Sequence, residues 1–254
     1  MSLPCVMVAP NGARRGKADH PALPVTIPEI VACAVDCQAA GADGIHAHVR
    51  DAEGAHVLDA GLYAELIAAL AQATPGLAVQ ITTEAVGRYS AAEQRALVAA
   101  VRPRMVSVAL REILDEPQIG RTRAFFHDCA GAGIQVQHIL YDAAEVDRLA
   151  ALQADGTIPA GEVQLLHVLG RYAAGQVSAP ADLDAPLARQ HARSIAADWA
   201  VCAFGPAETA CLVAAGRRGG KMRIGFENNL YNADGRLAAS NAQRVRDLLS
   251  HAAP

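Results

Sequence analysis

Two histidines separated by one residue, His46 and His48, are the first side chains whose spacing suggests chemistry. They lie in an apolar run, residues 44–49, that is predicted to be a strand, and side chains two apart in a strand point to the same face. Two neutral imidazoles about 7 Å apart along a strand can share a metal ion, and imidazole is a good zinc ligand. Buried histidines with ordinary hydrogen-bond partners show the same spacing, so a third ligand has to support the metal interpretation.

The candidate third ligand is Glu227, which follows the last apolar run, residues 222–226. Arg223 and Glu227 fall on one face of this predicted strand, whereas Ile224 and Phe226 fall on the other. Buried charge is costly unless it is paired or bound to a metal. Because residues four apart in a strand are too distant to be direct neighbours, we expect Arg223 and Glu227 to have separate partners rather than to form an ion pair. Glu227 would then complete a three-ligand site with an open coordination position, as catalytic zinc requires.

Further polar residues lie near the predicted ends of other strands. Thr82 and Thr83 close the third strand and Ser107 lies near the end of the fourth. Their hydroxyls can hydrogen-bond a substrate carboxylate or carbonyl, although threonine is also simply favourable in strands. Arg14 follows the first strand and either binds an anionic group or lies in solvent.

The elements that must position these residues repeat one pattern, a short β-rich run followed by an Ala-rich amphipathic stretch. The expected strands are residues 6–9, 44–49, 78–82, 105–108, 134–139, 163–169, 199–204 and 222–226. The expected helices are residues 28–40, 60–72, 91–101, 118–132, 142–153, 183–196, 207–215 and 239–251. Ser90 and Glu93 have the spacing of a capping box at the start of the third helix.

This alternation predicts the fold class, α/β. Eight strands alternating with eight helices are typical of parallel βαβ units, and eight units favour closure into a (β/α)8 TIM barrel. No glycine-rich phosphate motif follows a strand, which argues against an open nucleotide-binding sheet. We therefore predict one barrel domain over residues 1–254, with its chemistry at the carboxyl ends of the strands.

Composition excludes several classes of protein. Hydrophobic residues make up 52 % of the chain and charged residues 19 %, which is enough for a large core and unlike a disordered chain. The net charge is −4 and no basic run stands out, so no nucleic-acid partner is expected. An export signal and an apolar run long enough to span a bilayer are both missing, so we expect a soluble, cytoplasmic protein without a membrane partner.

Three segments together resemble the β-keto acid cleavage enzymes. They are residues 8–13, with Asn11-Gly12, residues 40–51, with His46-Ala47-His48-Val49-Arg50-Asp51, and residues 223–229, with Arg223-Ile224-Gly225-Phe226-Glu227-Asn228-Asn229. The resemblance runs in order from about residue 6 to residue 250 and includes Ser240-Asn241-Ala242.

The resemblance implies a (β/α)8 barrel, one zinc ion held by His46, His48 and Glu227, and a homo-tetramer. It also implies a reaction in which a β-keto acid and acetyl-CoA give acetoacetate and a new CoA thioester. A metal that chelates the β-keto acid stabilises enolate charge, and Arg223 adds a fixed cation beside it.

The chain departs from the family pattern at acidic positions. The family usually has Asp, with a role as base, where this chain has Asn228. A member of the family that acts on an ammonium substrate has Glu where this chain has Arg14. The acidic segment of strand five appears as residues 136–139 and includes Gln137, and a Ser-Thr-Gly after strand three appears as Thr82-Thr83-Glu84. We therefore expect a substrate that is neutral or anionic at its distal end, bound by Arg14, with Gln137 and the hydroxyls in the same pocket.

Asn228 leaves the source of a base open. His138 or Glu84 is a replacement candidate. Two other functions fit the same metal barrel: an aldolase-like enolate lyase that does not use CoA, and a metal-binding homologue with impaired turnover. Turnover of β-keto acids with and without acetyl-CoA separates these alternatives.

Overall fold

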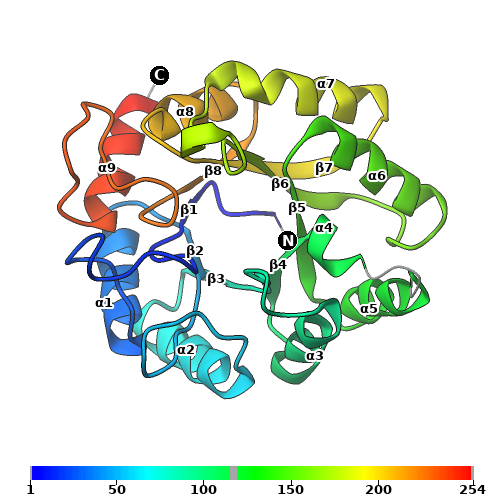
Figure 1. Cartoon of the computed structure of the whole chain (residues 1–254), viewed down its shortest axis with the longest axis horizontal. Helices are drawn as coiled ribbons and strands as arrows, with labels where there is room; N and C mark the ends of the chain where they lie inside the picture. Colours follow the sequence, from blue (N-terminus) through cyan, green and yellow to red (C-terminus); the bar gives the residue numbers. More distant parts are fainter. Residues whose placement is uncertain (1, 115–118, 253–254) are drawn as a thin grey trace.

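Eight parallel strands close into a barrel in the order β1 to β8 in the computed structural model, which describes residues 2–114 and 119–252. The α/β TIM-barrel prediction is therefore confirmed. The helices surround the strands in a ring (Figure 1). The strands are β1 Val6–Val8, β2 Gly44–Ala47, β3 Ala78–Thr82, β4 Met105–Ala109, β5 Gln135–Leu140, β6 Val163–Leu169, β7 Ala197–Ala203 and β8 Lys221–Ile224.

The helices connect successive strands over the outside of the barrel. They are α1 Ile27–Ala39, α2 Ala60–Ala73, α3 Ala91–Val101, α4 Leu110–Ile113, α5 Ile119–Gly131, α6 Ala143–Ala154, α7 Asp184–Ala192, α8 Glu208–Arg217 and α9 Asn241–Ala252, with 3-10 turns η1 Ala174–Gln176 and η2 Pro180–Leu183. The eight predicted helices are present with ends shifted by a few residues, and the predicted start of α5, Gln118, lies outside the described residues. The short α4 was not predicted. No helix in the described ranges is long and apolar enough to cross a membrane.

Helix starts follow local capping chemistry. The predicted capping box of α3 is confirmed, because the Ser90 side chain accepts from the Glu93 amide and Glu93 accepts in return. Thr26 and Glu29 make the same box at α1, next to Pro28 in the first turn. These caps satisfy amides that would otherwise lack partners and fix where each helix leaves the barrel mouth.

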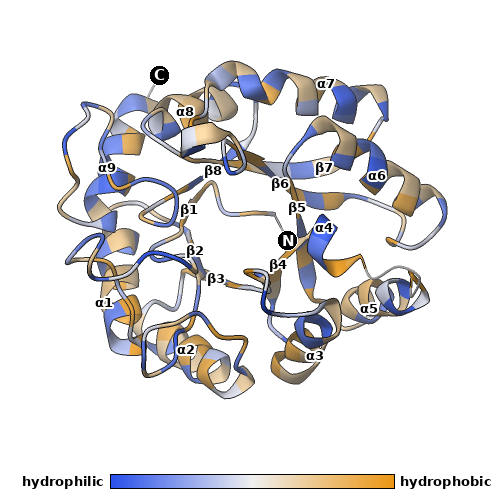
Figure 2. Cartoon of the chain, viewed as in Figure 1, coloured by the Kyte–Doolittle hydropathy of each residue, from blue (hydrophilic) through white to orange (hydrophobic). Residues whose placement is uncertain are grey.

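Two apolar layers hold the barrel together. Helix ribbons alternate between hydrophobic and hydrophilic residues along their length (Figure 2). Their apolar faces pack on the outward side chains of the strands, such as Ile45, Ile81 and Leu165. A smaller cluster, including Met7, Met105 and Leu166, fills the inside of the barrel. Because strand side chains alternate, the polar residues of the inner face share that interior with this cluster.

Candidate active site

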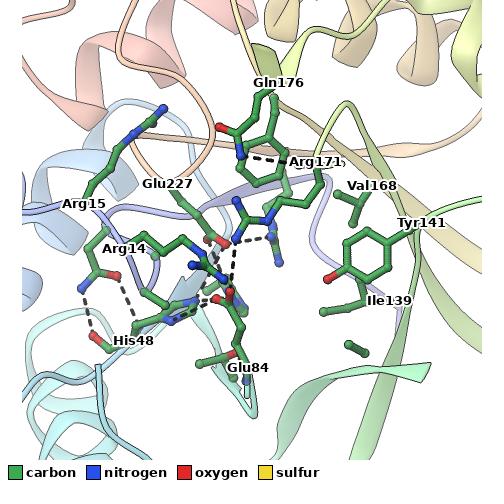
Figure 3. Close-up of a pocket in the computed structure, with 18 of the residues that line it drawn as sticks. Arg14, Arg15, His48, Glu84, Ile139, Tyr141, Val168, Arg171, Gln176 and Glu227 are labelled. Carbon is green, nitrogen blue, oxygen red and sulfur yellow. Dashed lines mark hydrogen bonds and ion pairs between the residues drawn. The ribbon is translucent and has the colours of Figure 1, made fainter. Parts of the chain in front are cut away.

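The two histidines and Glu227 meet at the carboxyl end of the strands, beside a cavity of about 290 Å³ (Figure 3). His46 Nε2 and His48 Nε2 are 3.1 Å apart, which confirms that both rings point to one side. Glu227 Oε2 lies 3.8 Å from His46 Nε2, and Glu227 Oε1 lies 3.9 Å from His48 Nε2. One ligand atom from each residue falls within 4.8 Å of the others, a spacing that a single metal ion can bridge.

The donor atoms of this group suit a divalent metal. Burial lowers the pKa of His46 and of His48 well below the ordinary histidine value, and the positive charge of Arg223 acts in the same direction on both. Both rings are therefore neutral, the form that binds metals. Glu227 Oε2 is buried and has no hydrogen-bond partner among the described residues. A buried carboxylate oxygen facing two neutral imidazoles is a donor set that a cation satisfies.

Glu227 also forms an ion pair with Arg223, so the expectation that these residues would have separate partners is wrong. Arg223 Nη2 lies 3.2 Å from Glu227 Oε1. The reason is that β8 ends at Ile224 rather than Phe226, and the chain turns at Gly225, where φ is +150°. A Cβ on Gly225 would lie 2.2 Å from the Ala9 oxygen, so only glycine fits this turn. The turn carries Glu227 back over Arg223.

The loop after β1 contacts two members of the group formed by His46, His48 and Glu227. The Asn11 side chain accepts from the His48 amide at 3.3 Å and donates to the His48 oxygen at 2.9 Å. Gly12 packs directly against the Glu227 side chain. Arg50 donates to the Asn11, Gly12 and Arg15 oxygens and so ties the loop to the end of β2. The His-x-His-Val-Arg segment thus supplies both candidate ligands and the arginine that holds this loop.

Three arginines line the cavity in addition to Arg223: Arg14, Arg15 and Arg171. Arg171 Nη2 lies 3.5 Å from Glu84 Oε1, and Arg15 donates to the Phe226 oxygen at 2.5 Å. Arg14 points into the cavity (Figure 3) and makes no hydrogen bond or ion pair within residues 2–114 and 119–252. The hydrogen-bonding groups of the Arg14 guanidinium are therefore available to a ligand at the mouth.

Glu84 is a carboxylate on the same wall of the cavity. Its Oε2 lies 3.9 Å from His48 Nδ1, and its side chain is 21 % exposed. Burial, with Glu227 acting in the same direction and Arg171 in the opposite one, raises the pKa of Glu84 to about 7. Of the two groups considered as a replacement base, only Glu84 lines the cavity. His138 points away from the interior and its ring stacks against Phe126 at 5.1 Å.

The other predicted site residues divide into two groups. Thr82 lines the cavity, where its Oγ1 accepts from the Glu84 amide at 3.0 Å. Four residues are buried but are not among the lining: Thr83, Ser107, Gln137 and Asn228. Thr83 donates to the Ser107 oxygen at 3.2 Å, and the Ser107 hydroxyl has no partner among the described residues. The nitrogen and the oxygen of the Asn228 side-chain amide also have no hydrogen-bond partner among the described residues.

Sequence reasoning missed Gln80, whose Oε1 lies 2.8 Å from His46 Nδ1. A signal was present, because Gln80 precedes Thr82 by two residues and so shares its inward face. Arg15 and Tyr141, which also line the cavity, were missed as well. Neither residue has a neighbour in the sequence that distinguishes it from an ordinary loop or strand-end residue.

Three similar proteins illustrate the relationships of the chain. It is 27% identical to the 3-oxoadipate:acetyl-CoA acetyltransferase of Cupriavidus necator, over 96% of this chain and 87% of that protein. It is 28% identical to the 3-keto-5-aminohexanoate cleavage enzyme of Fusobacterium nucleatum, over 92% of this chain and 85% of that protein. In structure it is similar to ObcA, solved in ternary complex with a C4-CoA adduct and oxalate, with a TM-score of 0.73 at 17% identity.

The likeness to ObcA concerns the fold alone, because the two sequences are only 17% identical. It covers 91% of this chain and 63% of ObcA. A model of the beta-keto acid cleavage enzymes matches residues 4–253. That match includes the histidine pair, the turn that carries Glu227 and the loop that supports both. Because the family model covers almost the whole chain, the protein is an enzyme of the beta-keto acid cleavage enzyme family.

Proposed function

We propose that this protein is a zinc-dependent β-keto acid cleavage enzyme that condenses a β-keto acid with acetyl-CoA to give acetoacetate and a new CoA thioester. The observation that carries the proposal is the buried group of His46, His48 and Glu227 beside the cavity. Two neutral imidazoles and one carboxylate are ligands typical of catalytic zinc, which keeps a further position open. Zinc bound there would act as a Lewis acid that chelates the keto acid and stabilises enolate charge.

The bonds exchanged define what the protein has to do. Loss of a proton from C2 of the keto acid gives a carbanion that attacks the acetyl carbonyl of acetyl-CoA and displaces the CoA thiolate. The thiolate then attacks the original keto carbon, and cleavage of the C2–C3 bond gives the new thioester and the C2 carbanion of acetoacetate. The proton first taken from C2 returns to this carbanion, and acetoacetate is released. Both attacks build negative charge on oxygen, so fixed positive groups at the site lower their barriers.

Arg223 is the fixed positive group that we assign to this task. Its side chain is 5% exposed and is held by Glu227, and its Nε and Nη1 have no partners among the described residues. These groups are therefore available to oxygen atoms of a substrate. Preorganised donors of this kind act strongly because the protein does not have to reorganise when charge develops.

Glu84 is the group that we propose takes the C2 proton. Asn228 does not line the cavity and an amide does not accept a proton as a base, whereas Glu84 lies in the cavity beside Thr82. We propose that Thr82 contacts the substrate. The buried Thr83, Ser107 and Asn228 are proposed to shape the strand ends around it.

The substrate that suits this cavity is anionic at its distal end. Four arginines and four carboxylates line the cavity (Arg14, Arg15, Arg171, Arg223; Asp19, Glu84, Glu112, Glu227), so a divalent metal makes the lining net positive. Arg14 supplies a guanidinium that makes no hydrogen bond or ion pair with the described residues. A dicarboxylic β-keto acid matches both features, and the relative from C. necator is named for 3-oxoadipate.

A substrate panel tests the proposal. We expect the zinc-loaded protein to consume 3-oxoadipate only with acetyl-CoA, to release acetoacetate, and to prefer this acid to 3-keto-5-aminohexanoate. Consumption without acetyl-CoA would support the aldolase-like alternative. Asn228 is an amide, which does not act as a base, and this favours a homologue with impaired turnover. Zinc binding without consumption of any β-keto acid would establish that alternative.

A further inference from the structure

A chain of buried hydrogen bonds runs from His46 across the barrel to a backbone carbonyl. His46 Nδ1 lies 2.8 Å from Gln80 Oε1, and Gln80 Nε2 donates to Gln137 Oε1 at 3.0 Å. Gln137 Nε2 then donates to the Leu165 oxygen at 3.1 Å. The three side chains are 1%, 0% and 1% exposed, and the four residues come from β2, β3, β5 and β6.

The last bond fixes the direction of all the others. The Leu165 oxygen can only accept, so the Gln137 atom beside it must be the NH2 group. Gln137 therefore turns its oxygen to Gln80, which must offer its own NH2 group there. That leaves the Gln80 oxygen facing His46, whose Nδ1 must carry a proton. A neutral imidazole protonated at Nδ1 has its lone pair on Nε2.

This lone pair points at the position that a metal would occupy. His46 Nε2 is the atom that lies 3.1 Å from His48 Nε2 and 3.8 Å from Glu227 Oε2. If one amide in the chain reversed, two donors or two acceptors would face each other in the buried interior. His48 has no such support, because its Nδ1 has no hydrogen-bond partner among the described residues.

We propose that Gln80 and Gln137 are positioning residues that hold His46 in the Nδ1–H tautomer, so that Nε2 is ready to bind the metal. The carbonyl of Leu165 sets the direction of the chain, and Gln137 transmits it to Gln80. Gln137 acts on the metal site from outside the cavity lining, through two intervening side chains. The inference rests on the proposed function only in requiring that a metal binds at His46.

The test measures the tautomer of His46 in metal-free protein by long-range ¹H–¹⁵N correlation, and zinc affinity by competition with a chelator. In the wild type we expect His46 protonated at Nδ1. In Gln137→Leu the Gln80 amide is free to reverse, so we expect a mixture of tautomers and a loss of zinc affinity of about 10- to 100-fold. Gln80→Leu removes the direct partner and should have at least the same effect.

Gln190→Leu is a matched control, because Gln190 Oε1 lies 3.1 Å from Nε2 of another buried histidine, His167, outside the site. It should leave zinc affinity and the His46 tautomer unchanged. Gln137→Met keeps the length of the side chain but removes both the donor to Leu165 and the acceptor for Gln80, so it replaces the leucine variant if that variant does not fold. Folded Gln137 variants with wild-type zinc affinity and a fixed Nδ1–H tautomer would overturn the inference. Neither measurement requires turnover, so a protein inactive on every β-keto acid would refute the proposed function and leave this result standing.

Discussion

Gly12 lies directly against the side chain of Glu227. A Cβ added to Gly12 would come within 2.5 Å of Glu227 Cγ, and the backbone of Gly12 has a φ of +60°. Gly12, in the loop after β1, therefore limits the positions that the Glu227 carboxylate, which follows β8, can occupy. Because β1 and β8 are the strands that close the barrel, the fit of these two residues depends on closure itself.

The first prediction is that Gly12→Ala weakens metal binding. The methyl group displaces Glu227 from the two histidines, and an L-residue at positive φ adds strain. We expect at least a tenfold loss of zinc affinity, measured by chelator competition. Gly16→Ala in the same loop is the control, since nothing lies within 4 Å of the added Cβ there. Full zinc affinity in Gly12→Ala would show that Glu227 is not held by this contact.

A second prediction concerns substrate charge. Arg14→Gln removes the guanidinium that has no partner within the described residues, and a hydrogen bond to a charged group contributes about 1.5–3 kcal/mol. We expect kcat/KM for 3-oxoadipate to fall about 10- to 100-fold, while the value for a neutral β-keto acid changes little. Arg14→Glu should shift the preference towards 3-keto-5-aminohexanoate.

Lys17→Gln is the control for Arg14, because Lys17 is a cation of the same loop that pairs with Glu29 at 2.7 Å and is not among the cavity-lining residues. Equal losses for neutral and dianionic substrates in Arg14→Gln would assign Arg14 to the shape of the loop rather than to substrate charge.

The sequence was sufficient to predict the fold and the grouping of His46, His48 and Glu227, because the barrel and the histidine pair follow from periodicity. The strand period of two places His46 and His48 on one face wherever the strand ends, so ending β2 at Ala47 rather than residue 49 did not matter. The barrel then requires the carboxyl ends of β2 and β8 to meet at one mouth. Local pattern and topology together brought Glu227 to the histidines.

The same reasoning failed where the chain leaves the regular strand. Arg223 and Glu227 were placed four residues apart on a straight strand, but the turn at Gly225 brings them to 3.2 Å. Gln137 was expected in the substrate pocket, yet its amide is directed across the interior to Gln80. The first contact depends on a local turn, and the second depends on the distance between the non-adjacent strands β3 and β5. The periodicity of one segment specifies neither.

A third prediction is that Glu84→Gln lowers kcat while zinc stays bound. If Glu84 accepts the C2 proton, its amide variant loses general-base catalysis, which contributes about 10²- to 10⁴-fold. Glu112→Gln is the comparison, since Glu112 also lines the cavity but already accepts from the Ala85 amide at 2.9 Å. We expect a much smaller loss there. A Glu84→Gln protein that loses zinc before it loses kcat would instead assign Glu84 to orienting His48.

The last prediction concerns acid stability and a histidine outside the site. Burial lowers the pKa of His138 to about 4, against an ordinary value of 6.5. The unfolded chain therefore binds more protons than the folded one between these values. The contribution of the neutral His138 to the free energy of unfolding is complete above pH 6.5 and is lost as the pH falls towards 4.

Between pH 7.5 and pH 5 these values correspond to about 2 kcal/mol of unfolding free energy. His138→Leu should reduce the acid-induced loss by this amount, measured by urea unfolding with a chelator present so that metal release does not contribute. The exposed His251 provides the control variant, His251→Gln, which should keep the wild-type pH dependence. If His138→Leu loses as much stability on acidification as the wild type, His138 is not the buried neutral group that its packing against Phe126 indicates.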